Sequence, residues 1–227
     1  MRLYVVGTDT GVGKTRVAAA LARAARRGVT IVKLVQTGLP PGVPGDAEDA
    51  ARLADAARDA NDASHPTPWR ELARLREPAD PWNAALAAGL APLEAGALVT
   101  ALDALAGDLI VEGSGGAAVP LNADTSLSDV ALAAHCEAVL AIGLRLGCIN
   151  HALLTLGYLA GLGMRVRGAI TIEAFGPEPA AYRRQVERAL AAKVALTAHL
   201  PFDTDSARSV ASAAAHIASL CSSATLE

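Results

Sequence analysis

Gly7-Thr8-Asp9-Thr10-Gly11-Val12-Gly13-Lys14-Thr15 is the stretch that decides the fold of this chain. It follows a short apolar run at residues 2–6 and precedes an alanine-rich segment with helical spacing at 14–27. A strand, a glycine turn and a helix that opens on Gly-Lys-Thr can hold nucleotide phosphates, because N–H groups of the turn and the positive end of the helix face the anion. The sequence therefore predicts a phosphate-binding loop, in a variant form with Thr8 where the strict spacing wants a glycine.

Two side chains of this loop carry specific expectations. Lys14 is expected to reach the terminal phosphates of a nucleotide, and the Thr15 hydroxyl to ligate magnesium. The alternative is a plain glycine turn with an incidental lysine, which leaves the strand–turn–helix context and Thr15 unexplained.

The composition favours one cytoplasmic enzyme domain spanning residues 1–227, since 227 residues are too few for two full α/β domains. A net charge of −3 gives no electrostatic case for binding nucleic acid or a membrane surface. The chain begins directly with a strand, so no signal peptide is expected, and polar residues interrupt its most apolar stretch, 138–164. Cys136, Cys148 and Cys221 are widely spaced and are expected to be reduced thiols.

Apolar strands alternate with helical patterns along the chain. Strands are predicted at 2–6, 30–36, 108–112, 138–143, 166–173 and 195–199. Helices are predicted at 14–27, from Asp46 onward, and at about 92–106, 127–135, 150–162, 178–192 and 206–221. Residues 39–45 and 145–149 are expected to be loops, and the proline-rich residues 60–80 to contain short helices. This pattern predicts a single α/β domain similar to P-loop NTPases, with a mostly parallel sheet covered by helices on both faces.

Ligands in such sheets lie beyond the carboxyl ends of the strands, where three charged residues stand out. Lys33 lies in an apolar strand, where it either meets an anion such as a nucleotide phosphate or reaches water from a sheet edge. Glu112 either holds magnesium near the phosphate loop or accepts hydrogen bonds from loop N–H groups. Asp46 is either a metal ligand or the N-cap of the next helix. Only one further lysine is present, Lys193, for which a solvated helix end is the simple reading.

Four segments together resemble the dethiobiotin synthetases, the ATP-dependent ring-closing enzymes of biotin synthesis. Residues 7–15 match the phosphate loop of that family almost letter for letter. Lys33-Leu-Val-Gln-Thr-Gly38 is similar to its lysine strand, and Val111-Glu-Gly-Ser-Gly-Gly116 to its glutamate–glycine segment. Leu146-Gly-Cys-Ile-Asn-His151 resembles the loop that carries substrate contacts across its dimer interface, and Asp46 falls where the family has a magnesium-ligating aspartate.

The resemblance implies a reaction between 7,8-diaminononanoate, CO2 and a magnesium nucleotide, normally ATP. One amine takes up CO2 as a carbamate, whose oxygen attacks the γ-phosphate to give a carbamic–phosphoric anhydride. The second amine then attacks the carbonyl carbon, expels phosphate and closes the cyclic urea. No side chain need be a covalent nucleophile, so the site must position reactants and stabilise charge.

The resemblance also assigns roles to residues. The implied catalytic residues are Lys33, Lys14 and Thr10. The implied nucleotide-binding residues are Thr10, Gly11, Val12, Gly13, Lys14, Thr15, Glu112, Gly115, Ile172 and Pro201. The implied metal ligands are Thr15, Asp46 and Glu112, and the implied substrate-binding residues are Thr37, Lys33, Gly147, Cys148, Ile149 and Asn150.

A homodimer with the substrate site at its interface follows from the resemblance alone. Residues 147–150 would hold the distant carboxylate of the substrate bound mainly by the neighbouring subunit, since a turn before a helix offers free N–H groups. Asn150 as an ordinary helix N-cap explains that residue equally well.

Several residues depart from the family pattern. Leu34 replaces a proline after the strand lysine, Ser114 replaces an alanine, and Trp82 stands where histidine is common. Ile172 replaces an asparagine that reads the adenine edge, and it cannot form those hydrogen bonds. Either backbone groups near Pro201 read the base instead, or nucleoside triphosphates other than ATP also serve, and we favour the second hypothesis.

Two alternatives belong to other classes. A dimeric switch ATPase of the partitioning type usually has an extra lysine early in the phosphate loop, where this chain has Thr8 and Asp9. A non-catalytic nucleotide binder is suggested only by Ile172 and Trp82, and the presence of Lys14, Lys33 and Glu112 argues against it.

Overall fold

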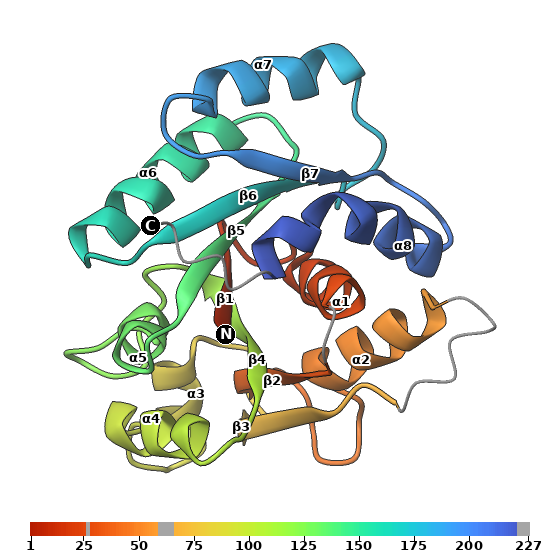
Figure 1. Cartoon of the computed structure of the whole chain (residues 1–227). Coiled ribbons are helices and arrows are strands. Elements are labelled where there is room, and N and C mark those ends of the chain that lie inside the picture. Colours follow the sequence, from red (N-terminus) through yellow and green to blue (C-terminus); the bar gives the residue numbers. More distant parts are fainter. Residues whose placement is uncertain (26–27, 59–65, 222–227) are drawn as a thin grey trace.

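The computed structural model describes residues 1–25, 28–58 and 66–221. Its centre is a seven-stranded sheet in the order β3-β2-β4-β1-β5-β6-β7, in which all paired strands are parallel (Figure 1). The strands are β1 (Arg2–Gly7), β2 (Val29–Thr37), β3 (Trp69–Leu75), β4 (Asp108–Gly116), β5 (Glu137–Gly143), β6 (Val166–Ile172) and β7 (Leu196–Leu200). The predicted α/β class with a parallel sheet is confirmed.

Helices cover both faces of the sheet because strand residues are buried on both sides. In β1, Leu3 and Val5 pack on one face while Tyr4 and Val6 pack on the other. The first face is covered by α1 (Lys14–Ala24), α2 (Asp46–Ala56) and α8 (Ser206–Ile217), with a short 3-10 turn at Ala218–Cys221. The second is covered by α3 (Pro81–Ala87), α4 (Ala95–Asp103), α5 (Leu127–Ala133), α6 (Cys148–Gly161) and α7 (Ala180–Leu190) (Figure 1).

Alanine builds much of the first layer. Residues 18–20 and Leu21 of α1 are completely buried, and α1 packs between α2 and α8. Small side chains allow these helices to approach closely, which compensates for the scarcity of aromatic residues in the core.

The expectation of short helices at 60–80 is wrong for residues 66–80, and residues 59–65 lie outside the described part. Trp69–Leu75 forms an edge strand that pairs with β2 from Ile31↔Trp69 to Thr37↔Leu75. An edge strand is half exposed, so its sequence is polar and does not show the apolar run of a buried strand. The prolines flank the strand, where they remove no ladder hydrogen bond.

Element ends differ by a few residues elsewhere. The most relevant difference is that α6 begins at Cys148, inside the predicted loop 145–149. Across the described residues, no helix is both long enough and apolar enough to cross a bilayer.

Candidate active site

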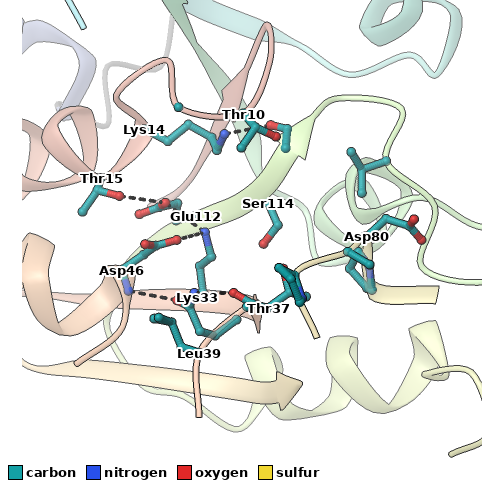
Figure 2. Close-up of a pocket in the computed structure, with 18 of the residues that line it drawn as sticks. Thr10, Lys14, Thr15, Lys33, Thr37, Leu39, Asp46, Asp80, Glu112 and Ser114 are labelled. Atoms are coloured by element: carbon teal, nitrogen blue, oxygen red, sulfur yellow. Dashed lines mark hydrogen bonds and ion pairs between the residues drawn. The ribbon is translucent and has the colours of Figure 1, made fainter. Parts of the chain in front are cut away.

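A cavity of about 710 Å³ opens at the carboxyl ends of β1, β2 and β4 (Figure 2). Parallel strands bring these ends to one edge of the sheet, as expected for a ligand site in this architecture. The predicted site residues that line the cavity are Thr10, Gly11, Gly13, Lys14, Thr15, Lys33, Thr37, Asp46, Glu112 and Gly115.

The phosphate loop joins β1 to α1 and needs left-handed backbone at two glycines. Gly11 has φ +74° and Gly13, the N-cap of α1, has φ +95°. Lys14 folds back over the loop, and its Nζ donates to the carbonyls of Asp9 (3.0 Å) and Gly115 (2.8 Å). Burial, and next the nearby Lys33 ammonium, lower the pKa of Lys14 to about 8.

Lys33 is held between two carboxylates. Its Nζ lies 2.5 Å from Oδ2 of Asp46 and 3.0 Å from Oε1 of Glu112, and it also donates to the Gly113 carbonyl (2.9 Å) (Figure 2). The lysine is only 2 % exposed, and β2 lies between β3 and β4. The alternative of a lysine that reaches water from a sheet edge is therefore wrong.

The charges of this cluster shift one another's pKa values. Burial alone lowers the pKa of Lys33, but Glu112 and Asp46 outweigh burial and hold that pKa above its ordinary value. Burial raises the pKa of Glu112, and the positive charge of Lys33 opposes this rise. Lys33 is thus a permanently charged ammonium group at the floor of the cavity.

The residues predicted to bind magnesium, Thr15, Asp46 and Glu112, lie near one another in the cavity lining (Figure 2). Glu112 Oε1 accepts hydrogen bonds from Thr15 Oγ1 (3.2 Å) and Lys33 Nζ (3.0 Å), so among the described residues side chains hold this carboxylate, and the alternative of loop N–H donors is wrong. Glu112 Oε2 is buried and has no hydrogen-bond partner among the described residues. A free buried carboxylate oxygen beside a hydroxyl and the Asp46 carboxylate is a donor set of hard oxygens, which fits Mg²⁺ when substrate phosphates complete its coordination.

Neighbouring residues hold Asp46 in the site, and Asp46 is not the N-cap of α2. The N-cap of α2 is Gly45, and Asp46 is the first helical residue. Gln36 Oε1 accepts the Asp46 N–H at 2.9 Å. Arg74 of β3, paired with Glu71, donates to the carbonyls of Pro40 (3.1 Å) and Val43 (3.0 Å) and fixes the loop before Asp46.

Several cavity residues were not predicted: Gln36, Gly38, Leu39, Pro78, Ala79, Asp80, Pro81, Ser114 and Val119. Asp80 accepts the Asn83 N–H and caps α3, with Pro81 at the first helical position. An Asp-Pro pair before an apolar segment is a helix-start signal that could have placed this wall of the cavity.

Other predicted residues lie away from the cavity. Val12 is buried, and residues 147–150 form the start of α6 outside the cavity lining. Gly147 is the N-cap of α6 with φ +93°, so the alternative of Asn150 as N-cap is wrong.

The predicted base-side residues also lie outside the cavity lining. Ile172 is completely buried, with its Cγ2 3.0 Å from the position that a Cβ on Gly13 would take. The Pro201 carbonyl accepts hydrogen bonds from Arg16 (2.8 Å) and Ser209 (3.0 Å), and the Phe202 N–H donates to Glu173 (2.8 Å).

Comparison with known proteins adds to this geometry. A family model described as an AAA domain matches residues 1–209. The ATP-dependent dethiobiotin synthetase of Rhodococcus jostii (strain RHA1) is 40% identical over 175 residues, covering 74% of this chain and 71% of that protein. The one from Anaeromyxobacter dehalogenans is 40% identical over 182 residues, covering 78% of each. Among solved structures, the septum site-determining protein MinD from Pyrococcus horikoshii superposes with a TM-score of 0.56 at 16% identity, over 98% of this chain and 97% of that one, which shows the fold alone.

The chain has a phosphate loop at the carboxyl end of β1 in a parallel sheet, and the family model matches residues 1–209. These two observations place the protein among the P-loop nucleotide-dependent enzymes. Within that class, the chain belongs to the ATP-dependent dethiobiotin synthetase family. It is accordingly a ligase that uses ATP to make dethiobiotin in biotin biosynthesis.

Proposed function

We propose that the cavity performs the ring closure with Lys14 and Lys33 as its two electrostatic catalysts. The observation that carries this proposal is the position of Lys33: a buried ammonium group on the floor of the same cavity that Lys14 borders. Substrate carbamate and γ-phosphate are both anions and repel each other, so their approach needs positive charge on both sides. Lys14 serves the phosphates, and Lys33 serves the carbamate oxygen and the developing anhydride.

The remaining residues position the reactants. Thr10 and Thr37 both line the cavity and donate hydroxyl hydrogen bonds to the same anions. Thr15, Asp46 and Glu112 are the residues that would hold Mg²⁺, which supplies further positive charge to the triphosphate when bound. The diamine substrate, 7,8-diaminononanoate, brings its own nucleophiles, so the protein contributes geometry and charge without a covalent intermediate.

We propose further that two copies of the chain form a homodimer through the start of α6. Three leucines within one short segment are exposed to solvent: Leu146 (94%), Leu153 (39%) and Leu154 (66%). Such a cluster of exposed apolar side chains is typical of a protein–protein contact. Residues 147–150 lie in this segment and would present helix N–H groups to the substrate carboxylate in the neighbouring subunit. Cytoplasmic location is part of the proposal, supported by the free thiols of Cys136, Cys148 and Cys221.

Relaxed nucleotide selectivity is the last part of the proposal. Ile172 is apolar and buried, and the backbone groups at 201–202 that could read a base already have side-chain partners. ATP, CTP and GTP are therefore expected to support comparable turnover. A strong preference for ATP in the same assay would contradict this part.

Phosphate release and dethiobiotin formation by the purified protein test the main proposal. Both should require 7,8-diaminononanoate and bicarbonate together, with Mg²⁺ and ATP present. Phosphate release at the same rate with and without the diamine would favour a switch ATPase. Nucleotide binding without any phosphate release would favour a non-catalytic binder.

A further inference from the structure

Arg145 lies outside the cavity lining but contacts the phosphate loop. It follows β5, and its guanidinium forms an ion pair with Asp9 Oδ2 while lying 4.9 Å from the ring centroid of Phe175, a residue that follows β6. The cation and the ring attract each other, so Phe175 limits where the guanidinium can point. One side chain therefore ties together the ends of three neighbouring strands, β1, β5 and β6.

Asp9 connects the Arg145 ion pair to two residues of the phosphate loop, Thr10 and Lys14. Its Oδ1 accepts the Thr10 N–H at 2.7 Å, and its carbonyl accepts Lys14 Nζ at 3.0 Å. The ion pair with Arg145 fixes the carboxylate, and the carboxylate fixes the backbone at Thr10. The orientation of the loop therefore depends on a residue that does not line the cavity.

The backbone carbonyl of Arg145 contacts the start of α6. Its carbonyl accepts the Tyr182 hydroxyl of α7 at 2.6 Å and the Cys148 N–H at 3.0 Å. Tyr182 also lies 3.4 Å from Cys148 Sγ, within the turn that opens α6. The same residue thus holds the phosphate loop by its side chain and the α6 turn by its backbone.

Stability does not explain the arrangement. The Arg145 and Asp9 side chains are 40% and 44% exposed, and an ion pair so open to water contributes little to folding. A contact of small energetic value that spans two binding regions is suited to set their relative geometry.

We propose that Arg145 is a positioning residue that couples nucleotide occupancy of the phosphate loop to diamine binding at the start of α6. The diamine half of this statement rests on the proposed function, in which residues 147–150 hold the substrate carboxylate of the neighbouring subunit. The coupling then runs between two sites of the dimer, through the Asp9–Arg145 pair.

The test measures the affinity for 7,8-diaminononanoate by calorimetry, with and without a non-hydrolysable ATP analogue and Mg²⁺. In the natural protein the analogue should raise diamine affinity by about fivefold or more, a usual size for coupling between sites. Arg145→Ala and Asp9→Asn should each bring this factor to within about twofold of unity, and the double variant should be no worse than either single one. Arg145→Lys keeps the charge and should recover part of the coupling.

Arg165→Ala is the matched control, because Arg165 forms a similarly exposed ion pair with Glu137 at the other end of β5. It should leave the coupling factor unchanged, and thermal unfolding should show all variants folded. The proposal is overturned if Arg145→Ala keeps the coupling factor of the natural protein, or if the natural protein shows none. A failure of the proposed function is distinct, since the natural protein would then make no dethiobiotin from the diamine and bicarbonate.

Discussion

Nζ of Lys33 lies 3.0 Å from Oε1 of Glu112, and the two side chains are only 2% and 1% exposed. A buried ion pair of this kind contributes little net stability as a pair, but the removal of one partner leaves an uncompensated charge at a buried position. Lys33 and Glu112 therefore have to be substituted together before their roles in folding and in turnover can be separated.

Lys33→Met should lower turnover by about 100- to 1000-fold, because it removes one of two cations from the reacting anions. It should also lower the free energy of unfolding by about 3–5 kcal/mol at neutral pH. Lys33→Met/Glu112→Gln should recover most of that stability in urea unfolding but none of the turnover. Lys193→Met is the control, since Lys193 is exposed, and near-normal turnover in Lys33→Met would refute the assignment.

Lys14 should link nucleotide binding to proton uptake. Its pKa of about 8 in the folded chain lies below the ordinary value of about 10.4 for lysine, so above pH 8 the folded chain holds fewer protons than the unfolded chain. The contribution of this residue to stability therefore rises with pH between about 8 and 10, and bound phosphate reverses the effect by drawing the proton back.

Calorimetry of nucleotide binding at pH 8.5 in two buffers of different ionisation enthalpy measures that uptake. The apparent heat should differ between buffers, and affinity should weaken as pH rises above 8. Lys14→Arg, which stays charged, should abolish both effects. Equal heats in both buffers for the natural protein would show that Lys14 is fully protonated before the nucleotide binds.

Gly45→Ala should disturb the approach of Asp46 to the site. An added Cβ would lie 2.0 Å from Glu71 Oε1 and 2.8 Å from Arg74 Nη2, so the ion pair that holds the preceding loop must move. We expect a loss of about 1–3 kcal/mol in stability and a larger relative loss of turnover at low Mg²⁺. Gly96→Ala in α4, where an added Cβ meets nothing within 4 Å, should be neutral or slightly stabilising.

Ile172→Asn should not create a preference for ATP. Ile172 is completely buried against Gly13, so an amide there would be buried without partners and would cost about 1–3 kcal/mol in hydrogen bonding alone. Turnover ratios among ATP, CTP and GTP should stay as in the natural protein, while the melting temperature falls. A gain in ATP selectivity at unchanged melting temperature would show that this side chain reaches the base.

Leu154→Asp should weaken the proposed dimer, because the leucine is 66% exposed on α6. A carboxylate placed in an apolar interface loses its hydration, so the molar mass by light scattering should shift from two chains toward one. The KM for the diamine should rise more than that for ATP. Leu86→Asp, an exposed leucine on α3, is the control and should leave the mass unchanged.

The sequence predicted the parallel sheet and about half of the residues that line the cavity, because these depend on local signals. Lys33 lies in an apolar strand, Glu112 follows the apolar run 109–111, and Lys14 opens the helix after the phosphate loop. The ends of their parallel strands must meet at one sheet edge, and the structure brings the three side chains together. The edge strand β3 was not predicted, because its residues are half exposed and do not form an apolar run. Asp80 was not among the predicted site residues: its Asp-Pro pair signals a helix start, but only the path of β3 and α3 brings that helix start to the cavity.

Ile172 shows a different limit. The family pattern indicates that Ile172 cannot read adenine, but it does not show that the side chain faces inward against Gly13 of the phosphate loop. The orientation of a strand residue near a turn depends on where the strand ends, and β6 ends one residue earlier than predicted.

The Lys33 cluster has a consequence for how the active site is maintained between turnovers. Glu112 is buried and Asp46 is 37% exposed, and their two carboxylates repel each other. The ammonium group between them acts as a counterion built into the chain. The fold therefore holds the carboxylates in place. When reactants bind, only the contacts among Lys33, Asp46 and Glu112 have to change. Such a floor is preorganised before any reactant arrives.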